Sequence, residues 1–557
     1  MRTWAKNPLS RDCPKPFSPG RRGTACAPLA RVPWNASVAR RGSGRGAGLG
    51  VRVRPQANLQ HPHDSKQKPM PIPTLSIATL AHLPSSVLTP SYDPKQTTIG
   101  IVHLGAGAFH RAHQAVYIDD LLAQDPTWAI CAVSLHSPTV RDALRPQDGL
   151  YTLALLDEHP QLRIIGAIRE VLCAADEQTA VLARLADPAV RLVTLTVTEK
   201  GYCLAGDTLD LAHPDIAHDI ANPGTPRSAI GYLVAGLQQR RQQSSAPFTV
   251  LSCDNLPDNG SLLRSAVLAL AQQHDPALAA WIDRQVSFPR SMVDSITPAT
   301  DDALRANVQA QTGLHDAWPI QRERYSQWVI EDRFCNGRPA FESAGVILSD
   351  DIAGYARAKL RLLNGPHSAL AYLGSLLDLE TVADAMRHTQ LATFVETLMR
   401  EDIAPTLQPM QGFDPQHYID AILARFRNPA IRHLLAQIAW DGSQKIPVRL
   451  LGVISDALDA GRRIDRLCIP VAAWLQFVRR QAANGITLVD PLSEVLSDIA
   501  HSTTGNASHD IAAFLTVDAV FATLSGDARF VEALERSYAA LHPGSPANAQ
   551  NALSTQG

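Results

Sequence analysis

Residues 97–114 of this chain read TTIGIVHLGAGAFHRAHQ and join a β-rich run to a helical pattern through a pair of glycines. The run at 99–104 contains isoleucine and valine, and apolar residues at helical spacing follow as far as Leu122. The next apolar run, 128–135, has the composition of a second strand. This order of strand, glycine turn, helix and strand is the one that a dinucleotide-binding fingerprint requires.

The two glycines have different roles in such a turn. Gly105 permits the tight turn after the strand, and Gly107 lets the backbone approach a pyrophosphate at the helix N-terminus. Histidine stands at 110, the usual position of a third glycine, so an ordinary strand-to-helix turn is the alternative. We expect the cofactor to contact the six residues of the turn, which are Gly105, Ala106, Gly107, Ala108, Phe109 and His110.

Short apolar runs alternate with helical stretches from about residue 98 to 345. Strands are expected at 99–104, 129–135, 192–197, 248–253 and 285–288, and a helix at 228–241. Buried parallel strands with crossover helices predict an α/β fold, a Rossmann-type doubly wound parallel sheet. Helical periods dominate after about residue 350, so a mostly α-helical C-terminal domain should follow. The expected parts are a disordered basic extension (1–69), the dinucleotide-binding domain (70–348), the helical substrate and catalytic domain (349–543) and a flexible tail (544–557).

The net charge of −2 conceals a basic N-terminal segment. Residues 1–69 contain 14 Lys and Arg but only Asp12 and Asp64, a net charge of +12, so the other 488 residues carry −14. The segment has no core-forming period. A nucleic-acid-binding arm and an organelle transit peptide are two interpretations. We favour a third, in which Met70 is the natural start and residues 1–69 are a misassigned extension.

Composition also limits the class of protein. No run approaches 18 apolar residues, so no segment is expected to span a membrane. The eight cysteines are scattered without a C-x-x-C pair, which predicts neither a zinc site nor a disulfide framework. We therefore expect a cytoplasmic protein with no bound metal and with no nucleic-acid or membrane partner. The oligomeric state stays open.

A second block, KLRLLNGPH at 359–367, supplies side chains suited to acid–base chemistry. On an α-helix, Asn364 lies about 140° and His367 about 80° round from Lys359, so all three can face one side. A lysine whose pKa is lowered by burial can take a proton from an alcohol. The amide and the imidazole can hold the oxygen as it becomes an alkoxide or a carbonyl. A surface helix whose Lys and Arg reach solvent is the alternative.

Polar clusters follow three of the expected strands. They are TVTEKGY (196–202), SCDNLPDNG (252–260) and FPRSMVD (288–294). Each alone would be an ordinary polar turn. Three of them at the carboxyl edge of one sheet predict a ligand site, because α/β sheets bind ligands at that edge.

These blocks together resemble the mannitol dehydrogenase family, the polyol-specific long-chain dehydrogenases and reductases. The matching segments are GAGAFHRAHQ (105–114), TLTVTEKGYC (194–203), VLSCDNLPDNG (250–260), FPRSMVDSITPAT (288–300), QWVIEDRF (327–334), KLRLLNGPHS (359–368) and DGSQKIPVRLL (441–451). The resemblance extends from about residue 95 to 540. It implies a Rossmann-type domain, a helical C-terminal domain and zinc-independent hydride transfer with NAD.

The resemblance also implies roles for individual residues. Lys359 would be the general base in alcohol oxidation and the acid in ketone reduction, while Asn364 and His367 hold the reacting oxygen. Glu199 would relay protons between Lys359 and solvent. The implied substrate-binding residues are Asn255, Lys200, Arg432 and Lys445, and the three cations among them are candidates for binding a carboxylate. Structural ion pairing is the alternative for Glu199 and Lys445.

Local features are similar to the fructuronate reductase branch of the family. Lys200 follows Glu199, and Gln437 stands where the mannitol branch has a polyol-contacting arginine. The resemblance therefore implies NAD-dependent interconversion of D-mannonate and D-fructuronate, with a sugar acid or polyol as the small-molecule partner. A mannitol-type 2-dehydrogenase and a dinucleotide-binding sensor without turnover are the alternatives.

Two departures from the family pattern bear on the site. Pro366 replaces a small polar residue, and it is expected to kink the helix between Asn364 and His367. No acidic residue directly follows the second strand, where His136 stands, so NADP is an alternative to NAD.

Overall fold

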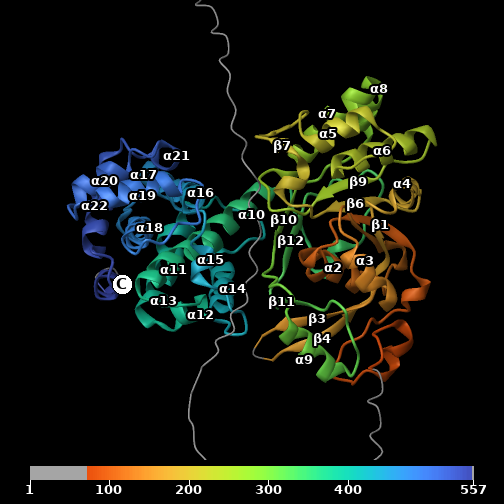
Figure 1. Cartoon of the computed structure of the whole chain (residues 1–557), viewed down its shortest axis with the longest axis horizontal. Helices are drawn as coiled ribbons and strands as arrows, with labels where there is room; N and C mark the ends of the chain where they lie inside the picture. The colour runs from red at the N-terminus through yellow and green to blue at the C-terminus, as the bar shows by residue number, and fades with distance from the viewer. Residues whose placement is uncertain (1–71, 158, 555–557) are drawn as a thin grey trace, which may run out of the picture. The chain divides into compact units, whose positions relative to one another are not determined.

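The structure is a computed structural model that describes residues 72–157 and 159–554 (Figure 1). The predicted extension at 1–69 and the proposed start at Met70 lie outside these residues. A five-stranded, all-parallel sheet forms the centre of the first domain. In spatial order its strands are β5 (Ile168–Cys173), β2 (Ala129–Ser134), β1 (Ile99–Leu104), β6 (Leu192–Leu195) and β9 (Thr249–Ser252).

Both faces of this sheet are apolar and covered. Val102, Val193 and Val250 pack in one core with residues of α4, α6, α7 and α8, whereas Ile101 and Leu251 pack in another with residues of α2. Successive residues of a strand point to opposite faces, so this burial on both sides is that of a doubly wound sheet, as predicted. The helices of this domain are α1 (Ala108–Ala112), α2 (Gln114–Leu121), α3 (Thr139–Leu144), α4 (Gln178–Ala186), α5 (Pro214–Ala221), α6 (Ala229–Gln242), α7 (Asn259–His274), α8 (Pro276–Gln285) and α9 (Asp302–Thr312).

One predicted strand, 285–288, is wrong. Helix α8 runs to Gln285, and the segment after it makes a single sheet bond, from Val250 N–H to Ser287 O at 3.0 Å. Pro289 has no N–H with which to continue the ladder. The strand forms beyond the proline, as β10 (Ser291–Asp294), while β5 of the main sheet was not predicted.

Small sheets border the main one. They are β10 with β12 (Gln327–Ile330) and β13 (Ile347–Leu348), β11 (Ile320–Glu323) with β3 (Tyr151–Leu156) and β4 (Gln161–Ile165), and the hairpin of β7 (Leu204–Ala205) and β8 (Thr208–Leu209). Strand β10 matters most for function, because it forms the second half of the third predicted polar cluster, 288–294.

The second domain is helical, as predicted. Its elements are α10 (Ile352–Ala358), η7 (Lys359–Asn364), α11 (Gly365–Leu376), α12 (Val382–Arg387), α13 (Thr389–Thr397), η8 (Leu398–Ile403), α14 (Pro415–Arg427), α15 (Leu435–Ile438), α16 (Gly442–Ile446), η10 (Pro447–Leu451), α17 (Gly452–Asp459), α18 (Asp465–Ala483), α19 (Ser493–Ser502), α20 (Ala507–Phe514), α21 (Asp518–Phe521), α22 (Ala528–Leu541) and α23 (Pro546–Ser554). None of the helices in the described residues has the length and hydropathy needed to cross a membrane.

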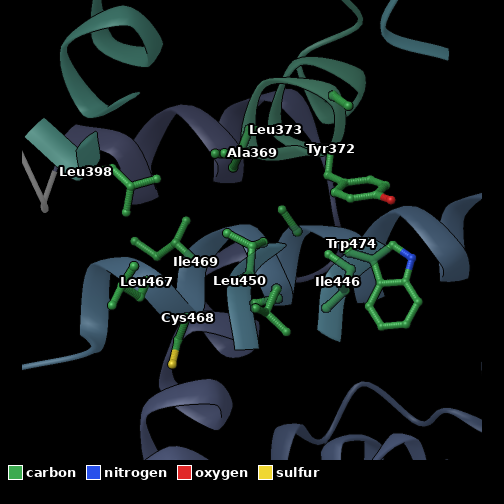
Figure 2. Close-up of a cluster of buried hydrophobic side chains, with 14 of the residues drawn as sticks. Ala369, Tyr372, Leu373, Leu398, Ile446, Leu450, Leu467, Cys468, Ile469 and Trp474 are labelled. Carbon is green, nitrogen blue, oxygen red and sulfur yellow. The ribbon is translucent and has the colours of Figure 1, made fainter. Parts of the chain in front are cut away.

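The core of the helical domain forms around α11 and α18. Figure 2 shows Tyr372 and Leu373 of α11 facing Ile469 and Trp474 of α18, with Leu450 of η10 between them. All five side chains are at most 4% exposed. This core fixes the position of the helices that carry the second polar block.

The C-terminal segment differs from the expected flexible tail. Residues Pro546–Ser554 form α23, and its residues Ala549, Ala552 and Leu553 are buried in the helical core. Their spacing of three and four residues places them on one face of the helix, which gives this short segment a reason to dock.

A buried cluster of charges joins the two domains. Arg425 of α14 donates to Asp294 of β10 at 2.6 Å and to Glu323 of β11 at 2.8 Å. All three side chains are at most 6% exposed. Glu323 also accepts a hydrogen bond from the main-chain N–H of Ile296. A charge that loses its partner in such a place is costly, because water does not replace the lost contact.

Replacing Arg425 with methionine should therefore destabilise the protein. We expect a loss of about 3–5 kcal/mol, since two carboxylates would be left buried without their cation. Urea denaturation followed by circular dichroism measures the change. Arg432→Met is the matched control, because Arg432 makes an exposed pair with Glu380 and its loss should cost about 1 kcal/mol or less. Equal effects of the two substitutions would contradict this account of the domain contact.

Candidate active site

Lys359 begins η7, and its ammonium group reaches the Rossmann-type domain. Its Nζ donates hydrogen bonds to Asn255 Oδ1 at 2.9 Å and to the main-chain oxygen of Val293 at 2.8 Å. Asn255 follows β9, and Val293 lies in β10. Burial lowers the pKa of Lys359 from that of an ordinary lysine. This shift favours the neutral amine that a general base must be.

Asn364 and His367 line the same cavity as Lys359. The ring of His367 packs against Phe426 and edge-on against His433, with centroids 4.4 Å and 5.1 Å away. Its Nε2 is buried and has no hydrogen-bond partner among the described residues. Burial holds the pKa of His367 well below its usual range, so the ring is neutral. A neutral imidazole with an unused nitrogen can donate to, or accept from, a substrate oxygen.

The helix that carries these residues is not the regular α-helix assumed in the prediction. Residues Lys359–Asn364 form a π-helical turn, and the N–H of Gly365 donates to Leu360 O, five residues back. Pro366 follows at once, and in a regular helix its ring would clash with the carbonyl four residues earlier. The wider turn relieves that clash. The helical backbone continues from α10 into α11, so the expected kink does not separate Asn364 from His367.

These side chains surround a cavity of about 320 Å³. It is lined by Asp294, Ile296, Lys359, Leu363, Asn364, His367, Arg425, His433, Gln437, Ile438, Lys445 and Arg449. Asp294 and Ile296 belong to the Rossmann-type domain, and the other residues to the helical domain. The cavity thus needs both domains, and its polar lining is suited to a small hydroxylated molecule.

Two predicted substrate-binding residues lie at the site. Asn255 contacts Lys359 directly. Lys445 lines the cavity, and its Nζ donates to the main-chain oxygens of Ile438 and Trp440. These carbonyl contacts hold the ammonium of Lys445 at the cavity wall without neutralising its charge.

Three other predicted residues do not line the cavity. Glu199 and Lys200 are exposed on the turn after β6, and Arg432 is exposed and pairs with Glu380. The structure therefore does not bring Lys200 or Arg432 to the cavity. Their long side chains lie at the surface, and for Arg432 the nearby carboxylate of Glu380 is the partner. The relay role of Glu199 stays a prediction.

Three charged or imidazole side chains of the cavity, Arg425, His433 and Arg449, were given no role from the sequence, and Asp294 was included only as the end of the third polar cluster. Arg449 stands four residues after Lys445 in a segment already singled out, and this helical spacing could have pointed to it. Arg425 has no comparable local pattern, because its partners are 131 and 102 residues away in the chain.

The glycine turn has the open geometry that a pyrophosphate needs. Gly105 has a φ of +98°, and a Cβ there would lie 2.1 Å from Thr196 O. A Cβ at Gly107 would meet only Gly105 O, at 3.8 Å, so the backbone here can be approached. His110 is buried and stacks on His103 of β1 at a centroid distance of 3.4 Å. These stacked rings make the close strand-to-helix contact that a third glycine makes in other dinucleotide-binding domains.

A second cavity, of about 450 Å³, lies at the carboxyl ends of β2 and β5. Leu135, His136 and Ala174, which follow these strands, form part of its wall. Dinucleotide-binding sheets hold the adenosine half of the cofactor at this edge. Asp142, the first acid after β2, pairs with Arg141. The end of β2 therefore offers an imidazole instead of a carboxylate to the ribose, and NADP stays an alternative.

The glycine turn and the buried lysine, amide and imidazole define a Rossmann-type oxidoreductase. Residues 99–343 match the mannitol dehydrogenase Rossmann domain, and residues 351–542 match the mannitol dehydrogenase C-terminal domain. The chain belongs to the mannitol dehydrogenase family. It is thus an oxidoreductase that acts on CH–OH groups, and the predicted family and two-part architecture are confirmed.

Individual relatives cover most of the chain. The D-mannonate oxidoreductase of Escherichia coli (strain K12) is 42% identical over 463 residues, which are 81% of this chain and 95% of that protein. The uncharacterized oxidoreductase YeiQ of the same organism is 42% identical over 468 residues, 82% and 95% of the two chains. The Pseudomonas fluorescens mannitol 2-dehydrogenase, solved as a ternary complex with NAD and D-mannitol, superposes with a TM-score of 0.73. It is 37% identical and covers 87% of this chain and 100% of its own. NAD, the predicted cofactor, is thus the one bound in a solved relative.

Removing the amine of Lys359 should abolish turnover but leave cofactor binding intact. We expect Lys359→Ala to lower kcat by at least about 100-fold, because a positioned acid–base group contributes roughly 10²–10⁴-fold. NADH binding, followed by quenching of protein fluorescence, should change little, since the glycine turn is separate from η7. A variant with near-normal kcat would remove Lys359 from the chemistry.

The pH dependence should report the same lysine. Alcohol oxidation needs the neutral amine, so kcat/KM in that direction should rise with pH and level off above the pKa of Lys359. Burial lowers this pKa, so the midpoint should lie below the ordinary lysine value of 10.5. Ketone reduction needs the ammonium and should decline over the same range. Steady-state rates in both directions across this pH range test the point, and midpoints at or above 10.5 would contradict it.

Proposed function

We propose that the protein is a fructuronate reductase, which interconverts D-fructuronate and D-mannonate with NADH and NAD⁺. The main support for this proposal is the positive charge of the cavity lining. Two cationic side chains of its lining, Lys445 and Arg449, have no carboxylate closer than 4.0 Å among the described residues, whereas Arg425 is paired with Asp294 and Glu323. A cavity with this excess of positive charge favours an anionic sugar over a neutral one.

Two further observations support the sugar acid. Gln437 lines the cavity, and it stands where the mannitol branch of the family has a polyol-contacting arginine. The similarity to the E. coli D-mannonate oxidoreductase covers nearly the whole of that relative. Both observations favour a hexuronate, and neither depends on Lys200 or Arg432.

The residues of the cavity account for the proton and the oxygen. When bound, the nicotinamide would supply or accept the hydride at the sugar carbon. In ketone reduction the ammonium of Lys359 gives its proton to the carbonyl oxygen, and in alcohol oxidation the neutral amine takes the hydroxyl proton. Asn364 and His367 hold that oxygen as its charge changes. Asn255 and the carbonyl of Val293 accept hydrogen bonds from Lys359 and so orient it.

A mannitol-type 2-dehydrogenase is the second candidate. The structural similarity to the Pseudomonas fluorescens enzyme, whose complex contains D-mannitol, favours it. Such an enzyme would act on a neutral polyol or ketose, which gives the excess cations of the cavity no partner. A dinucleotide-binding sensor is the third candidate, and the presence of Lys359, Asn364 and His367, the proposed acid–base and oxygen-binding residues, around one cavity argues against it.

The substrate is tested by NADH oxidation with the full chain. D-fructuronate and D-fructose, at equal concentrations, differ in the carboxylate that the cavity should recognise. We expect kcat/KM for D-fructuronate to be higher by at least about 100-fold, because a polar site discriminates strongly against a substrate that lacks the matching group. Lys359→Ala serves as the blank for NADH oxidation by contaminants.

Equal or greater turnover of D-fructose would overturn the sugar-acid assignment and favour the mannitol-type enzyme. Lack of turnover with both sugars would favour the sensor, provided that NADH still binds.

We also propose that the enzyme works in a reducing compartment, the cytoplasm. Six cysteines lie in the described residues, and all of them are free thiols. Five of these are buried, which fits a role in packing under reducing conditions.

A further inference from the structure

The two arginines of the active-site cavity have different partners. Arg425 is neutralised by Asp294 and Glu323, as described above. Arg449 has no carboxylate within ion-pair distance among the described residues. Its Nη1 donates to Ser368 Oγ at 3.2 Å and makes a long contact with Asn364 O at 3.4 Å. A guanidinium has five N–H donors, and the contacts of Arg449 use only those of Nη1, with two neutral oxygens as acceptors. The other donors can therefore bind another acceptor.

The surroundings of Arg449 disfavour an isolated charge. Burial lowers the pKa of Arg449, which reflects the lost hydration of its guanidinium. A partly dehydrated cation that faces a cavity is stabilised by an anion that enters the cavity. Lys445 lines the same cavity four residues earlier in the chain, and it pairs with Asp441 only at the long distance of 4.0 Å. The two cations therefore mark one positively charged side of the cavity.

The backbone around Arg449 places this side next to the reacting groups. Arg449 lies in the π-helical turn η10, which begins at Pro447, and η10 packs against η7. A Cβ on Gly365 would lie 3.1 Å from Arg449 O, so the two backbones are in close contact here. The contact of Arg449 with Asn364 O ties its side chain to the turn that carries Lys359. A six-carbon sugar acid held at Lys359 can thus extend its far end toward Arg449.

We propose that Arg449 is the residue that recognises the substrate carboxylate, with Lys445 as a supporting cation. This inference rests on the proposed function, in which the substrate is a hexuronate. The planar guanidinium can bind both carboxylate oxygens at once, which an ammonium does not do with the same geometry. Arg449 thus has the carboxylate-binding role that the sequence suggested for Lys200 and Arg432, which do not line the cavity.

The test compares D-fructuronate and D-fructose as substrates of the full-length wild type, Arg449→Gln and Arg449→Lys, with NADH. We expect Arg449→Gln to lower the ratio of the two kcat/KM values by roughly 30-fold or more, because truncating one partner of a desolvated charge pair is costly. Arg449→Lys should recover part of the ratio, since it keeps the positive charge but loses the planar group that binds both carboxylate oxygens. Arg432→Gln is the matched control and should leave the ratio unchanged.

The ratio separates recognition from a structural role. Arg449 also contacts Asn364, so a merely structural arginine would lower the kcat/KM of both sugars alike and leave the ratio constant. That result would overturn the inference. Competitive inhibition by D-mannonate and by D-mannitol gives a second measure. The Arg449→Gln substitution should weaken inhibition by D-mannonate and leave inhibition by D-mannitol unchanged. If D-mannonate and D-mannitol both inhibit the variant as strongly as they inhibit the wild type, Arg449 does not recognise the carboxylate.

The substrate preference of the wild type and that of Arg449→Gln separate the role of Arg449 from the identity of the substrate. A wild type that prefers D-fructuronate, together with an Arg449→Gln variant that keeps this preference, contradicts the role of Arg449 alone. A wild type without such a preference contradicts the hexuronate substrate, and the role of Arg449 fails with it.

Discussion

The site depends on one contact between domains, the ammonium of Lys359 held by Asn255 and by the carbonyl of Val293. The lysine comes from a helix, and its two acceptors come from the edge of a parallel sheet. Neither domain alone has a complete cavity. The buried cluster of Arg425, Asp294 and Glu323 holds the same two domains together, so it stabilises the fold and the geometry of the site at once. This explains why a costly buried charge cluster stands beside the reacting groups.

Local sequence patterns predicted those parts of the molecule that local chemistry determines. The strand at 99–104, the glycine turn and the block at 359–367 are all where they were expected. The π-helical turn at Lys359 was not predicted, because a helical wheel assumes regular spacing and Pro366 disturbs it. The ion pairs of Arg425 could not be predicted either, since they join residues more than a hundred positions apart. The strand at 285–288 was wrong because α8 extends to Gln285, and a short apolar run does not distinguish the end of a helix from a strand.

The distribution of charge divides the cavity into two functions. Near the Rossmann-type domain, Asp294 offsets Arg425, and burial favours a neutral Lys359, which suits proton transfer. In the helical domain, Arg449 has no carboxylate within ion-pair distance among the described residues and Lys445 has Asp441 at 4.0 Å, which suits the recognition of an anion. A surface lysine or arginine cannot serve this second function, because its charge is already screened by water and by nearby acids. Exposure, more than residue type, thus decides which cations act on the substrate.

The most direct test of this account is a crystal structure of the full chain with NAD⁺ and D-mannonate. The reacting hydroxyl should lie within about 3.2 Å of Lys359 Nζ, with Asn364 or His367 as a second partner. The carboxylate should then lie on the side of Arg449. A sugar whose reacting hydroxyl is turned away from Lys359, while the ammonium stays bound to Asn255 and Val293, would show that Lys359 is not the acid–base group.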